Sequence, residues 1–141
     1  MRLTKKIFLV DDDPTCIFLA KKIIANTNSI TKIDTNIAEF GNGQVAIDFL
    51  KHHIDYPEEL PDIIFLDINM PVMDGWGFLE EYSVIRSQIQ KSVMLYIVTS
   101  SVSPDEIRRA KQFNTVNEFI HKPIHKEKII EILEYISDPM L

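Results

Sequence analysis

The chain has 141 residues, 45% of them hydrophobic, and its 15 basic and 21 acidic residues give a formal net charge of −6. This length favours one domain with an ordinary hydrophobic core. The basic residues are scattered, which argues against binding to a nucleic-acid backbone. With one cysteine, Cys16, and no apolar stretch long enough for a membrane span or a signal segment, the sequence indicates a cytoplasmic protein with no membrane partner.

Short apolar runs alternate with segments of helical periodicity along the chain. The runs have the length of buried strands and comprise residues 7–10, 37–40, 63–66, 94–98 and 118–120. The apolar residues at helical spacing after these runs are, in order, Cys16, Leu19, Ile23 and Ile24; Val45, Ile47, Phe49 and Leu50; Phe78, Leu79, Tyr82 and Ile85; Ile107, Ala110 and Phe113; and Ile129, Ile130, Ile132, Leu133 and Ile136.

Five strand-then-helix units in succession predict an α/β fold. Strands that are apolar throughout are typical of a parallel sheet covered by helices on both faces. We therefore expect a doubly wound parallel sheet of five strands with five helices, (βα)5. Residues 52–61, HHIDYPEELP, have no regular period and predict a long exposed connection before the third strand.

Polar residues stand at the ends of four predicted strands. Asp11, Asp12 and Asp13 follow the first strand, Asp67 follows the third, Thr99 follows the fourth and Lys122 follows the fifth. Because ligands bind at the carboxyl ends of the strands in an open parallel sheet, we expect these side chains to face one crevice. Asp13 precedes Pro14 and is typical of a helix N-cap, so its predicted role is structural.

Asp11, Asp12 and Asp67 are candidate ligands for Mg²⁺. Any one of them alone could be a solvated surface acid, but three like charges held together destabilise the fold unless a cation or a proton shares the site. Oxygen-rich sites of this kind suit Mg²⁺. Lys122 and Thr99 would bind the oxygens of a phosphate, and a carboxylate can itself accept the phosphoryl group to give an aspartyl phosphate.

The chain resembles the receiver domain of two-component response regulators over essentially its whole length. The motifs that carry the resemblance are LVDDDP at 9–14, PDIIFLDINMPVMDGW at 61–76, IVTSS at 97–101 and HKP at 121–123. The resemblance implies a flavodoxin-like fold with the strand order 2-1-3-4-5. It implies further that Asp67 is the phosphoacceptor and that Asp12 binds Mg²⁺ directly. It also implies that Asp11 acts on the metal largely through water and that Asn69 offers its backbone carbonyl.

The same resemblance implies roles for residues at the last two strands. Thr99 would be the switch hydroxyl, Lys122 the phosphate-binding ammonium and Phe119 the aromatic switch. The peptide bond before Pro123 is expected to be cis, so that Lys122 points into the crevice while the chain turns into the last helix. Asn69 and Ser101 resemble positions that tune dephosphorylation.

One region departs from the family pattern. The path from Asp12 to Asp67 is longer than the family leads us to expect. We assign the excess to connections at residues 28–33 and 52–61, on either side of the second strand and helix.

The predicted protein is a stand-alone receiver, residues 1–141, without an output domain. It would be a signalling phosphoacceptor rather than an enzyme acting on a separate substrate. Its donor would be a sensor histidine kinase or a histidine phosphotransfer protein. Its output would be a phosphorylation-dependent protein–protein contact or relay of the phosphoryl group, with no nucleic-acid partner.

Two other classes use related architectures. A haloacid-dehalogenase-like phosphatase also phosphorylates an aspartate at a strand end, but it would require a second acid at the position of Asn69. A flavodoxin-type electron carrier requires a Ser/Thr/Gly-rich loop after the first strand, where the three aspartates would repel the flavin phosphate. Both fit the sequence less well than a receiver domain.

Overall fold

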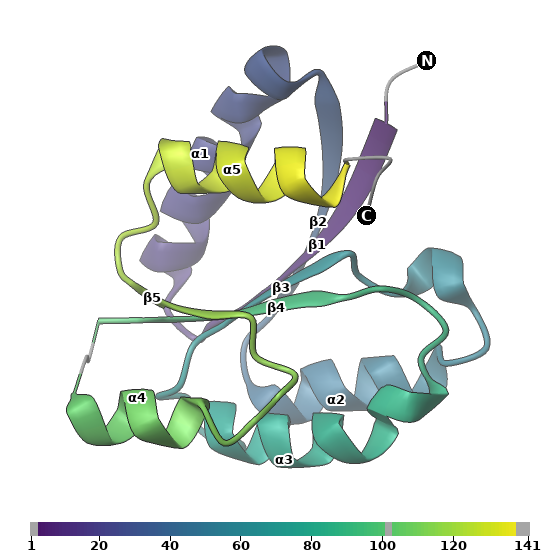
Figure 1. The fold of residues 1–141 in the computed structure, drawn as a ribbon, viewed down its shortest axis with the longest axis vertical. Coiled ribbons are helices and arrows are strands. Elements are labelled where there is room, and N and C mark those ends of the chain that lie inside the picture. Colours follow the sequence, from purple (N-terminus) through teal and green to yellow (C-terminus); the bar gives the residue numbers. More distant parts are fainter. Residues whose placement is uncertain (1–2, 101–102, 138–141) are drawn as a thin grey trace.

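The computed structural model describes residues 3–100 and 103–137. Within these ranges, one parallel sheet has the strand order β2-β1-β3-β4-β5 (Figure 1). Its strands are β1 (Leu3–Val10), β2 (Ile33–Phe40), β3 (Ile63–Leu66), β4 (Met94–Thr99) and β5 (Glu118–His121). The predicted doubly wound sheet and its strand order are confirmed.

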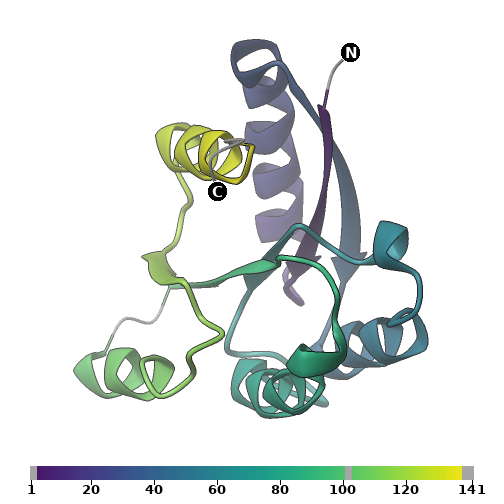
Figure 2. The same cartoon turned by 45° about the vertical axis from the view of Figure 1, so that its right-hand side comes forward.

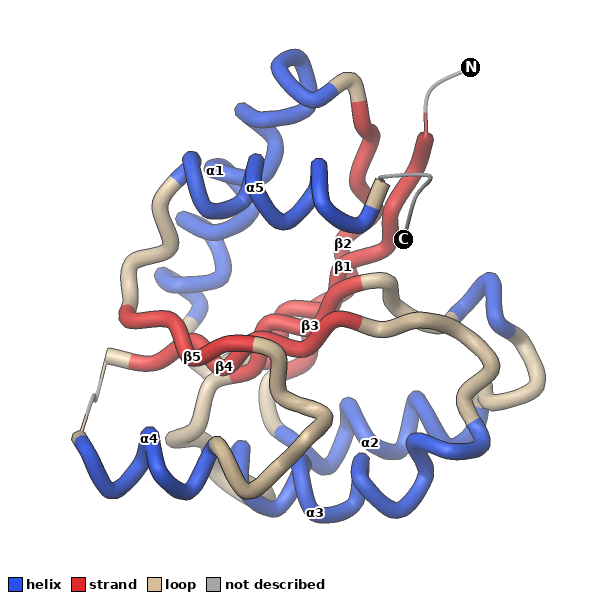
Figure 3. The backbone as a smooth tube through the Cα atoms, viewed as in Figure 1, coloured by secondary structure: helices blue, strands red, loops and turns tan. Residues whose placement is uncertain are grey.

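Helices cover both faces of this sheet (Figures 1 and 3). The α-helices of the described ranges are α1 (Pro14–Thr31), α2 (Gly43–His52), α3 (Gly75–Ile85), α4 (Pro104–Ala110) and α5 (Lys126–Ile136), with 3-10 turns at Pro57–Glu59 and Arg86–Gln88. One face carries α1 and α5, and the opposite face carries α2, α3 and α4. Figure 2 shows α1 lying alongside β1 and β2. No helix in the described ranges is long and apolar enough to cross a membrane.

The buried strands divide their side chains between two cores. In β1, Phe8 and Val10 enter the core under α2 and α3, and Ile7 and Leu9 enter the core under α1 and α5. This alternation is the period of two that a strand imposes. Each apolar side chain of this size that is fully buried contributes about 1.5–3 kcal/mol, which explains why β3, whose four residues are all buried, has no polar face.

The first helix starts where the sequence predicts and ends later. Asp13 is its N-cap, with a carboxylate oxygen that accepts from the Thr15 N–H at 2.9 Å. The expected connection at 28–33 is wrong, because the last turn of α1 runs to Thr31 and β2 begins at Ile33. Thr27 lies on the buried side of the helix, and the helix ends at its C-cap Lys32, which has a left-handed backbone and donates its N–H to the Asn28 carbonyl at 3.0 Å.

The segment 52–61 is a mostly exposed connection, as predicted, but its end is anchored. Leu60 is completely buried, and the Lys91 Nζ donates to the Leu60 carbonyl at 2.6 Å. Helical spacing also grouped Leu19 and Val45 with the buried residues of their helices. Both side chains are instead about half exposed, and the buried residues of these helices include Ile24 in α1 and Ala46, Ile47 and Leu50 in α2.

Candidate functional site

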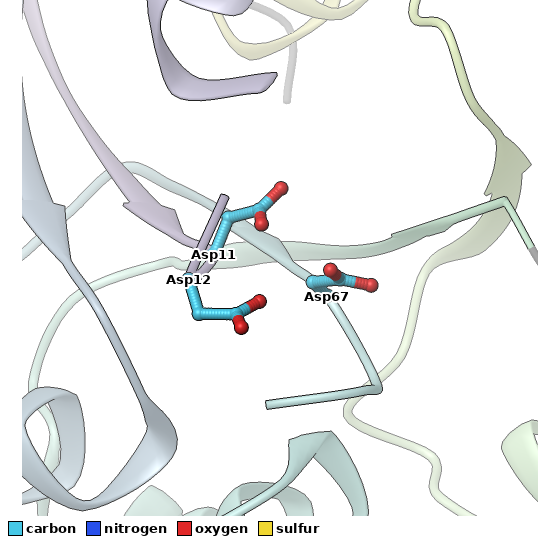
Figure 4. A group of neighbouring side chains, drawn as sticks. All are labelled: Asp11, Asp12 and Asp67. Carbon is cyan, nitrogen blue, oxygen red and sulfur yellow. The ribbon is translucent and has the colours of Figure 1, made fainter. Parts of the chain in front are cut away.

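The carboxyl ends of β1 and β3 lie side by side, because Val10 pairs with Leu66 in the sheet. The Asp67 N–H donates to the Val10 carbonyl at 2.9 Å, which ties the two strand ends together. Asp11 and Asp67 therefore leave the sheet as neighbours. Figure 4 shows their side chains with that of Asp12 at this edge.

Each of the three aspartates places a carboxylate oxygen within 4.8 Å of the other two. The side chains of Asp11 and Asp67 are 13% and 10% exposed, whereas Asp12 is open to solvent. Hard oxygen donors with one side open to water suit Mg²⁺, which keeps several of its waters when bound. This donor set fits the predicted metal.

Lys122 reaches the acids from the end of β5. Its Nζ lies 2.8 Å from Asp11 Oδ2 and 3.2 Å from Asp67 Oδ2. The Lys122–Pro123 bond is cis, as predicted, and the Lys122 N–H donates to the Thr99 carbonyl at 2.9 Å. Burial opposes the charged form of Lys122, but the hydrogen bond to Asp11 and the charges of Asp11 and Asp67 outweigh it and raise the pKa of Lys122. The site therefore holds a fixed cation.

The surroundings of Asp67 disfavour its charged form despite the ion pair with Lys122. Its Oδ1 accepts from the Ile68 N–H at 2.8 Å, while Oδ2 faces Lys122. Burial raises the pKa of Asp67; Lys122 opposes this rise and Asp11 adds to it, so the pKa stays above its ordinary value. The Lys122 ammonium contacts two of the three clustered carboxylates, those of Asp11 and Asp67, and a bound cation would relieve the repulsion among all three.

The turn after Asp67 is shaped by Gly75. A Cβ at Gly75 would lie 2.5 Å from the Asp67 carbonyl oxygen, and the Gly75 N–H donates to the Ile68 carbonyl at 2.8 Å. Asp74 caps α3 by accepting from the Gly77 N–H. The close approach of Gly75 to Asp67 is a tertiary contact, which no local sequence pattern specifies. The start of α3 is thus held directly against Asp67.

Thr99 and Phe119 lie on the same face of the sheet. Ile97 pairs with Phe119 in the register of β4 and β5, and Thr99 lies two residues after Ile97. Side chains two apart on a strand share a face. Thr99 is completely buried, and Phe119 is partly buried against the core on the α2, α3 and α4 side. The two predicted switch residues are therefore near each other on one face.

The remaining predicted residues are less informative. Asn69 is exposed in the turn after Asp67, and Ser101 lies outside the described residues. Cys16 is half-buried, and its thiol donates to Asp13 Oδ2 at 3.4 Å. Burial and this hydrogen bond raise the pKa of the Cys16 thiol, which disfavours the reactive thiolate.

Comparison with known proteins gives consistent matches. The model of the response regulator receiver domain matches residues 7–134. The probable methanogenesis regulatory protein FilR2 of Methanothrix harundinacea (strain 6Ac) is 31% identical over 97 residues, 69% of this chain and 61% of FilR2. Chemotaxis protein CheY of Bacillus subtilis (strain 168) is 26% identical over 131 residues, 93% of this chain and 96% of CheY.

A solved structure shows the same fold. The crystal structure of a two-component response regulator from Cytophaga hutchinsonii has a TM-score of 0.77 and 24% identity, and the match covers 96% of this chain and 98% of that one. The chain spans less than two thirds of the length of FilR2. With the family match over most of its length and an acidic cluster that fits a phosphoacceptor site, the chain belongs to the response regulator receiver domain family.

Proposed function

We propose that Asp67 accepts a phosphoryl group from a phosphohistidine of a sensor histidine kinase or a histidine phosphotransfer protein. The observation that carries this proposal is the position of Lys122, whose ammonium binds both Asp11 and Asp67 within a cluster of three carboxylates. Such a cluster combines a nucleophile with a cation that can receive phosphate oxygens.

The residues of the site divide the chemistry between them. A carboxylate oxygen of Asp67 forms a bond to phosphorus as the P–N bond of the donor breaks, and the electron pair of that bond stays on the imidazole. Lys122 and the hydroxyl of Thr99 bind the transferred phosphoryl oxygens. Asp11, Asp12, Asp67 and the Asn69 carbonyl would hold Mg²⁺, which supplies charge neutralisation to the approaching phosphate.

In this proposal residues 1–141 act as one receiver domain in the cytoplasm. Its output is a phosphorylation-dependent contact with another protein or relay of the phosphoryl group, without a nucleic-acid or membrane partner. The chain catalyses only its own phosphorylation and dephosphorylation. The formal charge of −6 supports the absence of nucleic-acid binding.

The phosphoacceptor is tested with a small donor. Acetyl phosphate should add one phosphoryl group to the wild-type protein only when Mg²⁺ is present, and Asp67→Asn should abolish the addition, measured by intact mass. Asp62→Asn is the matched control, because Asp62 lies just before β3 and Asp67 just after it. Undiminished labelling of Asp67→Asn, with the added mass on another residue, would overturn the assignment.

We further propose that Thr99 and Phe119 form a two-state element. A phosphoryl oxygen within reach of Thr99 favours a conformer in which the hydroxyl moves toward it, and the Phe119 ring then enters the space released. The face of α4, β5 and α5, which includes Ile107, Arg108 and Lys111, becomes the signalling surface.

The test of this element compares Thr99→Ala with the wild type. With Mg²⁺ and beryllofluoride, a phosphoryl mimic, Thr99→Ala should keep its Mg²⁺ binding and lose most of the amide shift changes near Phe119. Measurement by NMR across residues 103–122 decides this. Shift changes of wild-type size near Phe119 would exclude coupling through Thr99.

A further inference from the structure

Trp76 connects the turn after Asp67 to the α4 region. It is the one tryptophan of the sequence and the second residue of α3, and its side chain is only 7% exposed. It directly follows Gly75, whose backbone packs so tightly against the Asp67 carbonyl that no Cβ fits there. A shift of the Asp67 backbone therefore cannot leave the start of α3, and with it Trp76, unmoved.

Two contacts of the Trp76 ring come from the α4 region. The Arg109 guanidinium lies over the indole, 4.5 Å from its centroid. The Phe113 ring, in the segment after α4, is stacked with the indole at 6.3 Å between centroids and 23° between planes. A cation over one aromatic ring and a second ring packed against it are both attractive arrangements, so Trp76 is held by two residues that belong to α4 and its exit.

The α4 helix has few other anchors of this kind. All seven residues of this helix are described, and of these Ala110 is buried. The N-cap Ser103 accepts a hydrogen bond from the Glu106 N–H, and Asp105 pairs with Arg108. Both interactions lie within α4 and its cap and do not attach the helix to another element. A short helix with one buried residue depends on its side-chain contacts for position. Arg109 and Phe113 therefore make Trp76 a large part of what sets the place of α4.

We infer that Trp76, Arg109 and Phe113 form a latch that carries the state of Asp67 to α4. This inference rests on the proposed function, because it uses the same site, and it adds a route separate from Thr99 and Phe119. Binding at Asp67 shifts the latch only if the contacts of Trp76 differ between the two states. By reciprocity, if binding at Asp67 changes the free energy of the Arg109–Trp76 contact, removing that contact changes the binding free energy at Asp67 by the same amount.

The test uses Mg²⁺ and beryllofluoride as the probe, with two readouts. In the wild type, saturation should change the emission of Trp76, the one tryptophan, and the amide shifts of residues 103–111. Arg109→Ala should lose at least about half of the shift changes in α4 while those at residues 67, 68 and 122 persist. Its apparent affinity for beryllofluoride should change by about two- to fivefold, the span of one exposed cation–π contact.

Arg108→Ala is the matched control, since Arg108 is the exposed neighbour of Arg109 and pairs with Asp105 on its own helix. In Arg108→Ala the shift changes in α4 and the apparent affinity for beryllofluoride, neither of which involves a partner protein, should match those of the wild type. Phe113→Leu tests the other side of the ring and should act in the same direction as Arg109→Ala, with its fold checked by the spectrum before the probe is added.

The outcomes separate this inference from the proposed function. If the wild type shows no shift changes at residues 67 and 68 with Mg²⁺ and beryllofluoride, the proposed function fails. If those changes occur but α4 responds in Arg109→Ala and Phe113→Leu as strongly as in the wild type, the site stands and the latch is refuted. A wild-type α4 that does not respond to a saturated site refutes the latch as well.

Discussion

Charged side chains gather at both ends of β3, and the two groups differ in how their charges pair. At the carboxyl ends of β1 and β3, the Lys122 ammonium contacts Asp11 and Asp67, and Asp12 is the third acid of the cluster. Near the amino end of β3, Lys6 pairs with Glu59 and Lys91 pairs with Asp62. We call these four residues the amino-end group.

The amino-end group bonds its charges almost completely. Asp62 Oδ2 accepts from the Lys6 backbone N–H at 2.8 Å, and Asp62 Oδ1 lies 3.5 Å from Lys91 Nζ. Lys91 also donates to the carbonyls of Pro57 (3.2 Å) and Leu60 (2.6 Å). These contacts hold the 52–61 connection on the sheet. A balanced group is thus structural, and an unbalanced one is ready to bind a cation.

The largest expected effect is that of Mg²⁺ on stability. Because Mg²⁺ binds the native state and relieves repulsion among Asp11, Asp12 and Asp67, a concentration 100 times its dissociation constant should stabilise the protein by about 2.7 kcal/mol. Thermal melts with and without Mg²⁺ measure this, and Asp11→Asn should reduce it. A melting curve indifferent to millimolar Mg²⁺, with no binding heat by calorimetry, would remove the metal from the site.

Breaking the amino-end group should cost stability and leave the chemistry intact. Asp62→Ala removes the acceptor of the Lys6 N–H and the partner of Lys91, so we expect a loss of about 1–3 kcal/mol in urea unfolding. Phosphorylation by acetyl phosphate should not change. Glu59→Ala, which removes only the exposed pair with Lys6 at 3.4 Å, should cost less than about 1 kcal/mol. Equal costs for the two variants would contradict this view of the amino end.

The smallest expected effect concerns pH. Burial raises the pKa of Asp67 above its ordinary 3.8, so the native protein binds a proton there more readily than the unfolded chain. The stability of the metal-free protein should therefore fall as pH rises from about 3.8 through the raised pKa. Mg²⁺ affinity should weaken as pH falls through the same pKa, by at most about tenfold per pH unit, because a proton on Asp67 displaces the metal.

Calorimetric Mg²⁺ titrations across this pH range measure the effect. In Asp67→Asn the part of the pH dependence of Mg²⁺ affinity that comes from the Asp67 carboxyl should disappear. Persistence of the same pH dependence in Asp67→Asn would assign the titration to another group.

The locally encoded features were predictable from particular residues. Ile63–Leu66 forms the third strand with the predicted bounds, because a short apolar run that follows a proline and precedes an aspartate is typical of a buried strand. Asp13 and Pro14 begin α1 as expected. The sequence did not predict that α1 extends to Thr31, because the polar residues at the end of the helix have no strong apolar period. Thr27, which is completely buried there, is itself polar.

The sequence by itself determined the order of strands and helices, the strand-end positions of Asp11, Asp12 and Asp67, and the family motifs, because each depends on near neighbours in the chain. Only the tertiary structure decided how the charges pair. Lys122 meets Asp11 from 111 residues away, and Arg109 of α4 lies over the ring of Trp76 in α3. Such contacts depend on the register of the sheet and the packing of helices on it, which no local pattern specifies.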